Sequence, residues 1–414
     1  MKTLKCGLIG GKLGHSYSKL IHDKFQKYDY DLISLDADEV DAFLKKGDFD
    51  GLNVTIPYKL TVIPYCTYLS DAAKRIGSVN TLVKTENGFE GYNTDYHGFL
   101  SMAKRAGIDF KDKNVVILGS GGTSLTARTV SADEGAKKIT VVSRSGDTTY
   151  DMIDSLKDCE VLINTTPVGM YPNNGKSAVS LDSFPNCEAV LDVIYNPLRT
   201  PLLLQAKEKG LKYTGGLYML VSQAAQAARH FCNEEICDEK VEEVFRSLAL
   251  SVQNIVLVGM PGCGKTTIGR EIAKKTGRKF IDTDDIIVER AEMSIPEIFE
   301  KYGEAYFRKL ECEVVADFAK EKELVIATGG GAVINKLNSD ALAENGRIYY
   351  IKRDISNLAT KGRPLSKDAN KLQEMFCKRD PIYRACADYE IENNSTTFSN
   401  TAQKILDEFF ASTI

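Results

Sequence analysis

The sequence lacks the features that mark several large classes of protein. Its 10 cysteines include no C-x-x-C pair, its 4 histidines form no H-E-x-x-H motif, and no apolar run approaches the roughly 20 residues of a membrane-spanning helix. We therefore expect reduced, buried thiols and neither a disulfide framework nor a zinc centre. The opening residues MKTLKCGLIGG contain no apolar signal-peptide core, so a cytoplasmic protein is expected.

A large charge of one sign is also missing. The 53 Lys and Arg residues face 57 Asp and Glu residues, and neither residues 1–250 nor residues 251–414 carry the basic excess that is typical of nucleic-acid-binding proteins. At 414 residues the chain is long enough for about three domains. We expect small-molecule partners, no nucleic acid and no membrane, and a homo-oligomer stays an open alternative.

Short apolar runs alternate with amphipathic helical stretches along the chain, which predicts α/β folding with parallel sheets. A second series of such runs begins at NIVLVGMPG (254–262), directly after the helical stretch KVEEVFRSLALSVQ (240–253). No Gly-, Ser- or Pro-rich tether separates the two series. The sequence therefore predicts two α/β parts joined without a flexible linker.

A glycine cluster follows one predicted strand. In VVILGSGGT (115–123), Gly119, Gly121 and Gly122 precede a helical stretch, where backbone N–H groups can bind a pyrophosphate. Glycines of this kind can also serve only the turn, and the cluster alone leaves that alternative open. At the end of the next strand, where an NAD site usually has an acid, stands Arg144, whose charge suits a ribose 2′-phosphate. The pattern predicts NADP(H) as the cofactor.

Three polar clusters lie upstream of this turn, at predicted strand ends or in adjoining loops: HSYS (15–18), NVTIPYK (53–59) and NTD (93–95). When hydride reduces a ketone, a lysine can protonate the developing alkoxide while a carboxylate holds that lysine. Lys59 and Asp95 fit these roles. Each of them, taken singly, is more commonly a solvated surface charge.

The order of the motifs identifies a family resemblance. The clusters above, together with GSVNT (77–81), GYNTD (91–95), GSGG (119–122), NTTPVGM (164–170), DVIYNPLRTPLL (192–203) and GGLYMLVSQAA (215–225), resemble shikimate dehydrogenase over essentially all of residues 1–250. The resemblance implies NADPH-dependent reduction of 3-dehydroshikimate to shikimate. It also implies a substrate-binding domain at 1–100, completed by helices at about 217–250, and a Rossmann NADP domain at 101–216.

The same resemblance implies roles for individual residues. Lys59 and Asp95 become the catalytic pair. The residues implied to bind the substrate are Ser16, Ser18, Asn53, Thr55, Lys59, Asn80, Asp95, Tyr195 and Gln223. Gly216 and Met219 would flank the nicotinamide.

A second glycine loop, GMPGCGKT (259–266), matches the pattern G-x-x-x-x-G-K-[ST] between a predicted strand and a helix. Its backbone would surround phosphates, Lys265 would reach the β and γ oxygens, and Thr266 would ligate Mg²⁺. The loop predicts nucleotide binding only, because GTPases, ATPases and small-molecule kinases share it. The residues assigned to ATP are Gly259, Gly262, Gly264, Lys265, Thr266 and Thr267.

The motifs that follow narrow the reaction. FIDTDD (280–285), FRKLE (307–311), ATGGGA (327–332), KGRPLS (361–366) and KRDPIY (378–383) resemble shikimate kinase across residues 252–414, a P-loop fold of the nucleoside-monophosphate-kinase-like type. The resemblance implies ATP-dependent phosphorylation of shikimate. Asp282 would support Mg²⁺ and Asp284 would accept from the reacting hydroxyl. Arg363 would join the ATP-binding residues from a lid and meet the transferred phosphoryl group. The implied acceptor site consists of Asp284, Arg308, Gly329, Gly330, Gly331 and Arg379.

Together the two resemblances predict a bifunctional enzyme of aromatic amino-acid precursor synthesis that makes shikimate and then phosphorylates it. Two alternatives stay open: an NAD-linked quinate or shikimate dehydrogenase fused to a small-molecule kinase, and a non-catalytic regulator that senses shikimate or quinate. Arg144 argues against the first alternative. The presence of Lys59, Asp95, Lys265 and Asp284 argues against the second.

Overall fold

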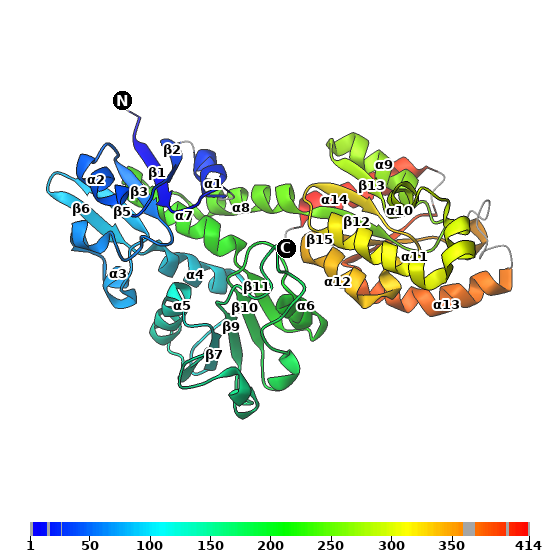
Figure 1. The fold of residues 1–414 in the computed structure, drawn as a ribbon, viewed down its shortest axis with the longest axis horizontal. Helices are drawn as coiled ribbons and strands as arrows, with labels where there is room; N and C mark the ends of the chain where they lie inside the picture. The colour runs from blue at the N-terminus through cyan, green and yellow to red at the C-terminus, as the bar shows by residue number, and fades with distance from the viewer. Residues whose placement is uncertain (1–2, 15–16, 26, 359–368, 395–396, 413–414) are drawn as a thin grey trace. The chain divides into compact units, whose positions relative to one another are not determined.

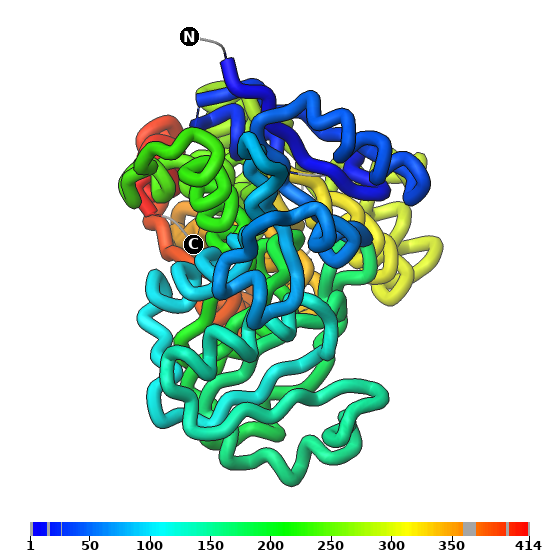
Figure 2. The backbone as a smooth tube through the Cα atoms, turned by 90° about the vertical axis from the view of Figure 1, so that its left-hand side faces the viewer, coloured from blue at the N-terminus to red at the C-terminus, as the bar shows by residue number. Residues whose placement is uncertain are grey.

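The computed structural model describes residues 3–14, 17–25, 27–358, 369–394 and 397–412. They form two compact units, whose chain can be followed in Figures 1 and 2. The first unit comprises residues 1–196 and 205–248, and the second comprises residues 197–204 and 249–414. Both units contain strands that alternate with helices, so the predicted α/β class is confirmed.

The first sheet of the first unit consists of β1 (Lys5–Gly10), β2 (Asp29–Ser34), β3 (Gly51–Val54), β4 (Cys66–Leu69), β5 (Thr81–Thr85) and β6 (Gly88–Tyr92). The strand order is β2-β1-β3-β5-β6-β4, and the sheet is mixed because β5 pairs antiparallel with both β3 and β6. Only Glu86 and Asn87 separate β5 from β6, and so short a connection cannot cross over to a parallel neighbour. The accompanying helices are α1 (Ser18–Phe25), α2 (Glu39–Lys46), η1 (Ile63–Tyr65) and α3 (Asp71–Ile76).

The second sheet of this unit is parallel throughout, in the order β11-β10-β9-β7-β8. Its strands are β7 (Asn114–Leu118), β8 (Lys138–Val142), β9 (Val161–Asn164), β10 (Ala189–Asp192) and β11 (Lys212–Gly215). The helices that follow in the chain are α4 (Thr94–Arg105), α5 (Gly122–Asp133), η2 (Tyr150–Ser155), η3 (Leu181–Ser183), α6 (Pro201–Glu208), α7 (Leu217–Cys232) and α8 (Asp238–Val252). Helices α4 and α7 pack together and lie between the two sheets (Figure 1).

The second unit has one parallel sheet in the order β13-β14-β12-β15-β16. Its strands are β12 (Asn254–Val258), β13 (Lys279–Asp282), β14 (Leu324–Ala327), β15 (Gly346–Lys352) and β16 (Tyr389–Glu392). Its helices are α9 (Lys265–Thr276), α10 (Thr283–Ala291), α11 (Ile295–Ala319), η4 (Ala332–Ile334), α12 (Lys336–Asn345), η5 (Ile355–Asn357), α13 (Ala369–Cys386) and α14 (Phe398–Ala411). The central strand β12 is buried along its whole length, as its apolar run NIVLV predicts for a strand covered on both faces.

The second unit includes a short segment, residues 197–204, that precedes its main body in the sequence. Within this unit Arg199 is buried, and its guanidinium pairs with the Asp388 carboxylate at 2.9 Å. Its Nε donates to the carbonyl oxygen of Ala343 at 2.8 Å, and the amide of Leu198 donates to Asn345 Oδ1 at 3.0 Å. A buried guanidinium is tolerated only with such complete pairing.

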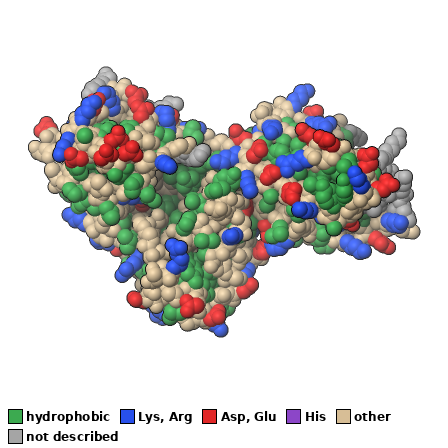
Figure 3. All heavy atoms as spheres, in the orientation of Figure 1, with side chains coloured by type: hydrophobic (Ala, Val, Ile, Leu, Met, Phe, Trp, Pro, Cys, Tyr) green, Lys and Arg blue, Asp and Glu red, His purple; other side chains and the backbone are tan. Residues whose placement is uncertain are grey.

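The surface mixes positive and negative side chains, as the nearly equal numbers of basic and acidic residues predict. On the face drawn in Figure 3, Lys and Arg side chains are interspersed with Asp and Glu over both units. Within the residues that the structure describes, every helix is too short or too polar to cross a membrane.

Candidate active sites

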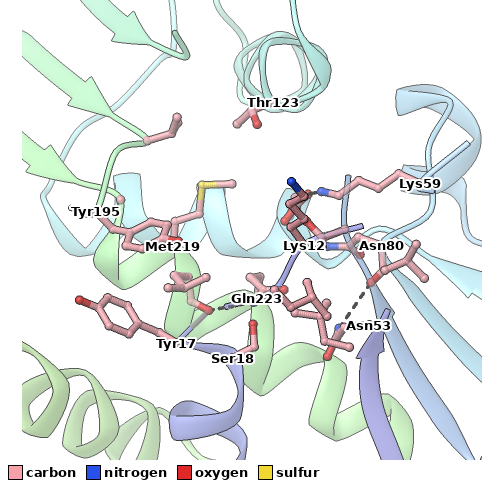
Figure 4. Close-up of a pocket in the computed structure, with 18 of the residues that line it drawn as sticks. Lys12, Tyr17, Ser18, Asn53, Lys59, Asn80, Thr123, Tyr195, Met219 and Gln223 are labelled. Carbon is pink, nitrogen blue, oxygen red and sulfur yellow. Dashed lines mark hydrogen bonds and ion pairs between the residues drawn. The ribbon is translucent and has the colours of Figure 1, made fainter. Parts of the chain in front are cut away.

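A cavity of about 510 Å³ lies in the first unit (Figure 4). Its walls come from the turn after β1, the end of β3, the residues around the start of β5, the first turn of α4, and α7. Among the described residues, all those that the sequence assigned to the substrate line it: Ser18, Asn53, Thr55, Lys59, Asn80, Asp95, Tyr195 and Gln223. Gly216 and Met219, assigned to the cofactor, line it too. Ser16 lies outside the described residues.

The predicted acid–base pair is assembled in this cavity. Lys59 Nζ donates to Asp95 Oδ2 at 2.6 Å, and both side chains are largely buried, at 28% and 17% exposure. Lys59 lies in the turn after β3, whereas Asp95 lies in the first turn of α4, where the helix dipole favours a carboxylate. The turn and the helix therefore bring together two charges that lie 36 residues apart in the chain.

Hydroxyl groups line the side of the cavity away from Lys59 (Figure 4). Ser18 is the first residue of α1 and is buried, and the rings of Tyr17 and Tyr195 lie with their centroids 5.6 Å apart. Burial raises the pKa of Tyr195, so its hydroxyl stays protonated and can donate a hydrogen bond. This side can bind an anionic or strongly accepting group of a ligand.

Three lining residues with polar side chains were not predicted from the sequence: Lys12, Tyr17 and Thr123. Tyr17 lies inside the HSYS motif, and Thr123 directly follows the glycine cluster, so the motif positions alone could have suggested both. Lys12 gave no such signal, because a single lysine in a loop is usually solvated. In Figure 4 its side chain extends toward Lys59.

The glycine turn has a geometry that suits a dinucleotide phosphate. Gly119 has φ +101°, in the region that favours glycine, and Gly121 is the N-cap of α5. A Cβ added at Gly121 or Gly122 would meet no atom within 4 Å, so the backbone of the turn is open to a ligand. Arg144 follows β8, the parallel neighbour of β7, and is exposed. The turn and the arginine therefore lie at the same edge of the sheet.

The P-loop of the second unit joins β12 to α9. Its predicted glycines Gly259, Gly262 and Gly264 have φ values of +142°, +87° and +103°, which other residues rarely adopt. Lys265 is 8% exposed, and its Nζ donates to the carbonyl oxygens of Gly259 at 2.8 Å and Met260 at 3.0 Å. The ammonium group is thus held inside the curve of the loop, where a phosphate would lie.

The groups assigned to the metal are adjacent. Thr266 Oγ1 donates to Asp282 Oδ2 at 2.7 Å, and the other carboxylate oxygen of Asp282 caps α10 by accepting from the amide of Asp284. A hydroxyl and one carboxylate fit Mg²⁺, which keeps several waters and takes its other ligands from substrate phosphates. The exposed Thr267 lies on the first turn of α9, and Arg363 lies outside the described residues.

The acceptor residues converge on the glycines of ATGGGA. A Cβ on Gly329 would lie 2.5 Å from Asp284 Oδ1, and a Cβ on Gly331 would lie 2.6 Å from an Arg308 nitrogen. The carbonyl oxygen of Gly330 accepts from Arg379 Nη1 at 3.0 Å. Asp284 and Arg308 can approach this backbone so closely only because Gly329 and Gly331 have no side chains. A Cβ on Gly330 would also lie 2.6 Å from Pro261, which places the acceptor loop against the P-loop.

The electrostatics of this group raise the pKa of Asp284 to about 6, first because burial disfavours the charged form and second because Asp282 is nearby. Glu311 was not predicted as a functional residue, although it ends the FRKLE motif. Its carboxylate is buried and accepts from Arg308 Nη1 at 2.8 Å, and burial raises its pKa. It therefore orients the Arg308 guanidinium toward the glycine loop.

Comparisons with known proteins match both units. Residues 8–82 match the family model described as shikimate dehydrogenase substrate binding domain, and residues 261–410 match the model described as shikimate kinase. A curated relative, the shikimate dehydrogenase (NADP(+)) of Clostridium perfringens strain SM101, is 37% identical over 263 residues, which cover 58% of this chain and 97% of the relative.

Solved structures resemble the first part of the chain. A chorismate mutase/shikimate 5-dehydrogenase fusion protein from Clostridium acetobutylicum superposes with a TM-score of 0.57 and 38% identity, covering 60% of this chain and 98% of that one. The shikimate 5-dehydrogenase of Thermus thermophilus in complex with NADP(H) and shikimate gives a TM-score of 0.54 and 28% identity, with 59% and 99% covered.

Proposed function

We propose that this chain is a bifunctional enzyme, because it belongs to the shikimate dehydrogenase family and continues into a shikimate kinase domain. One site reduces 3-dehydroshikimate to shikimate with NADPH, and the other phosphorylates shikimate with ATP. The observation that carries the proposal is the convergence of Asp284, Arg308 and Arg379 on a glycine loop that touches the P-loop. A P-loop alone serves many nucleotide reactions, whereas this convergence provides an acceptor site for a small anion with a hydroxyl group.

The dehydrogenase chemistry rests on Lys59. When bound, NADPH supplies the hydride that adds to the ketone carbon. As negative charge develops on the ketone oxygen, Lys59 donates a proton from Nζ to that oxygen, and Asp95 holds the ammonium in place through their 2.6 Å contact. Ser18 and Tyr195 bind the substrate carboxylate on the other side of the cavity, while the amides of Asn53, Asn80 and Gln223, with Thr55, bind its hydroxyls.

The kinase chemistry rests on charge placement. When bound, ATP supplies the phosphoryl group and Mg²⁺ neutralises part of its charge. Lys265 contacts the phosphates from within the P-loop, and Thr266 and Asp282 would hold the ion. Arg308 and Arg379 bind the carboxylate of shikimate, and Asp284 accepts the proton of the hydroxyl that attacks. The alternatives of an NAD-linked dehydrogenase and of a regulator are not favoured, because the curated relatives are NADP(+) enzymes and because the Lys59–Asp95 contact and the P-loop geometry of Lys265 suit catalysis.

Leaving out one reaction component at a time tests the proposal. The full chain is incubated with 3-dehydroshikimate, NADPH, ATP and Mg²⁺, then with each left out, while NADPH loss and ADP formation are followed. NADPH loss should require 3-dehydroshikimate but not ATP. ADP formation should require NADPH unless shikimate is added directly. ADP formation from 3-dehydroshikimate without NADPH would contradict the assigned order, and no ADP with added shikimate would contradict the kinase assignment.

The cofactor preference is tested at Arg144. Replacing it by Asp should lower the ratio of kcat/KM for NADPH to that for NADH by about ten- to hundredfold, because one charge-assisted contact contributes roughly 1.5–3 kcal/mol. Lys157→Asp, which makes the same charge change at another exposed position of the first unit, is the control and should leave the ratio unchanged. An unchanged ratio in Arg144→Asp would show that Arg144 does not bind the 2′-phosphate.

A further inference from the structure

Buried polar side chains lie behind the wall of the dehydrogenase cavity, and the mechanism above gives them no role. Tyr30 on β2 is 1% exposed, Thr81 at the start of β5 is 0% exposed, and Thr94 at the start of α4 is 1% exposed. Buried polar groups are costly unless they are hydrogen-bonded. Each of these three hydroxyls hydrogen-bonds an amide side chain that lines the cavity.

The Tyr30 hydroxyl is the first donor in a row of buried hydrogen bonds. Its hydroxyl donates to Asn53 Oδ1 at 2.8 Å, and its ring stacks on His22 with the centroids 3.9 Å apart and the planes 8° from parallel. Burial raises the pKa of Tyr30 well above its ordinary value, so the phenol keeps its proton and acts as a donor. Tyr30 therefore fixes Asn53 Oδ1 as an acceptor, and Asn53 Nδ2 donates to Thr81 Oγ1 at 3.1 Å and to the carbonyl oxygen of Asn80 at 3.4 Å.

Thr81 is the next residue in this row of hydrogen bonds. Its hydroxyl accepts from Asn53, so its single proton is free to go to Asn80 Oδ1 at 3.1 Å. The backbone amide of Thr94 donates to the same oxygen at 2.7 Å. These two donors occupy Asn80 Oδ1 from the protein side, which leaves the Nδ2 group of Asn80 to interact with a ligand. The Thr94 hydroxyl lies 3.2 Å from the same oxygen and 3.3 Å from Gln223 Oε1, and its one proton can go to either acceptor.

We infer that Thr81 is a positioning residue for the dehydrogenase, which together with Tyr30 fixes the amide orientations of Asn53 and Asn80, so that Asn80 presents its N–H donors to a hydroxyl oxygen of the substrate. The inference rests on the proposed function, because it specifies how that cavity recognises a polyhydroxy ring. Thr81 does not touch the reacting atoms. It fixes the orientation of both amides, because without its hydroxyl Asn53 loses an acceptor and Asn80 loses a donor.

The experiment compares Thr81→Val, which keeps the shape and removes the hydroxyl, with Thr81→Ser, which keeps the hydroxyl. In Thr81→Val the KM for 3-dehydroshikimate should rise about 10- to 30-fold, while kcat, the KM for NADPH and the kinase rate with added shikimate change less than about threefold. Thr81→Ser should return the KM to within about threefold of the starting protein. An unchanged KM in Thr81→Val, or an equal loss in Thr81→Ser, would overturn the positioning role.

A second variant and a binding measurement distinguish failure of the positioning role from failure of the proposed function. Tyr30→Phe removes only the hydroxyl that donates to Asn53, and it should raise the same KM about five- to tenfold. Calorimetric binding of 3-dehydroshikimate, without nucleotides, should weaken by the same factors in Thr81→Val and Tyr30→Phe and recover in Thr81→Ser. Failure of the proposed function would show as no NADPH loss in the unmodified chain. Equal 3-dehydroshikimate affinity in all proteins would overturn the positioning role even then.

Discussion

Lys59→Met is expected to lower the kcat of the dehydrogenase by about 10²- to 10⁴-fold, the range that a positioned general acid contributes. Methionine keeps the length of the side chain but has no proton to give to the ketone oxygen as hydride arrives. The kinase rate with added shikimate should stay unchanged, because Lys59 lies in the first unit. Steady-state NADPH loss and ADP formation, measured on the same preparation, check both halves of this expectation.

The control for this prediction is Lys46→Met, which removes an exposed lysine at the end of α2 in the same unit. It should leave kcat within about twofold. Asp95→Asn should lower kcat in the same direction as Lys59→Met, because the amide holds the ammonium less strongly than the carboxylate does. Near-normal turnover in Lys59→Met would refute the assignment of Lys59 as the proton donor.

Asp284→Asn is expected to lower the kinase kcat by about 10²- to 10⁴-fold, because an amide cannot accept the proton of the attacking hydroxyl. The pH dependence of the unmodified protein tests the same group. The pKa of Asp284 is raised to about 6, so below that pH the carboxyl is protonated and cannot act as a base. The kinase kcat/KM for shikimate should therefore fall about tenfold for each pH unit below about 6.

The same pKa shift predicts a gain in stability for Asp284→Asn. Because the pKa is higher in the folded than in the unfolded chain, the contribution of Asp284 to stability is full below pH 4 and is lost as the pH rises through about 6. Raising the Asp284 pKa from its ordinary value to about 6 corresponds to roughly 3 kcal/mol of folding free energy at most. The second unit should therefore unfold at a higher denaturant concentration in Asp284→Asn than in the unmodified chain at pH 8, with the difference disappearing near pH 4.

Asp285→Asn is the matched control, since it makes the same charge change one residue along α10 at an exposed position. It should keep kinase turnover within about threefold. A pH profile that is flat between pH 5 and pH 7, or full turnover in Asp284→Asn, would show that another group accepts the proton. Loss of turnover together with lower stability in Asp284→Asn would indicate a structural role instead.

The sequence predicted the α/β class because apolar runs and helical stretches alternate, and this local pattern is enough to indicate sheets covered by helices. The parallel arrangement that the same pattern predicted is wrong for the first sheet, because the short turn between β5 and β6 makes these two strands antiparallel. The glycine loops were also predictable, because a motif between a strand and a helix encodes its own local geometry. Gly259, Gly262 and Gly264 have the positive φ values that the P-loop motif implies.

The sequence by itself determined which family the first part of the chain resembles and which residues form the two glycine loops. It also determined which charged residues each motif contains. Only the tertiary structure decided how these charges are paired, because hydrogen bonds between distant segments leave no local signal. It brought Lys59 to Asp95, placed Thr81 between two amides of the cavity, and buried Glu311 against Arg308. It also assigned residues 197–204, which the sequence placed in the Rossmann NADP domain, to the second unit, since the contacts of a buried side chain such as Arg199 decide where a segment belongs.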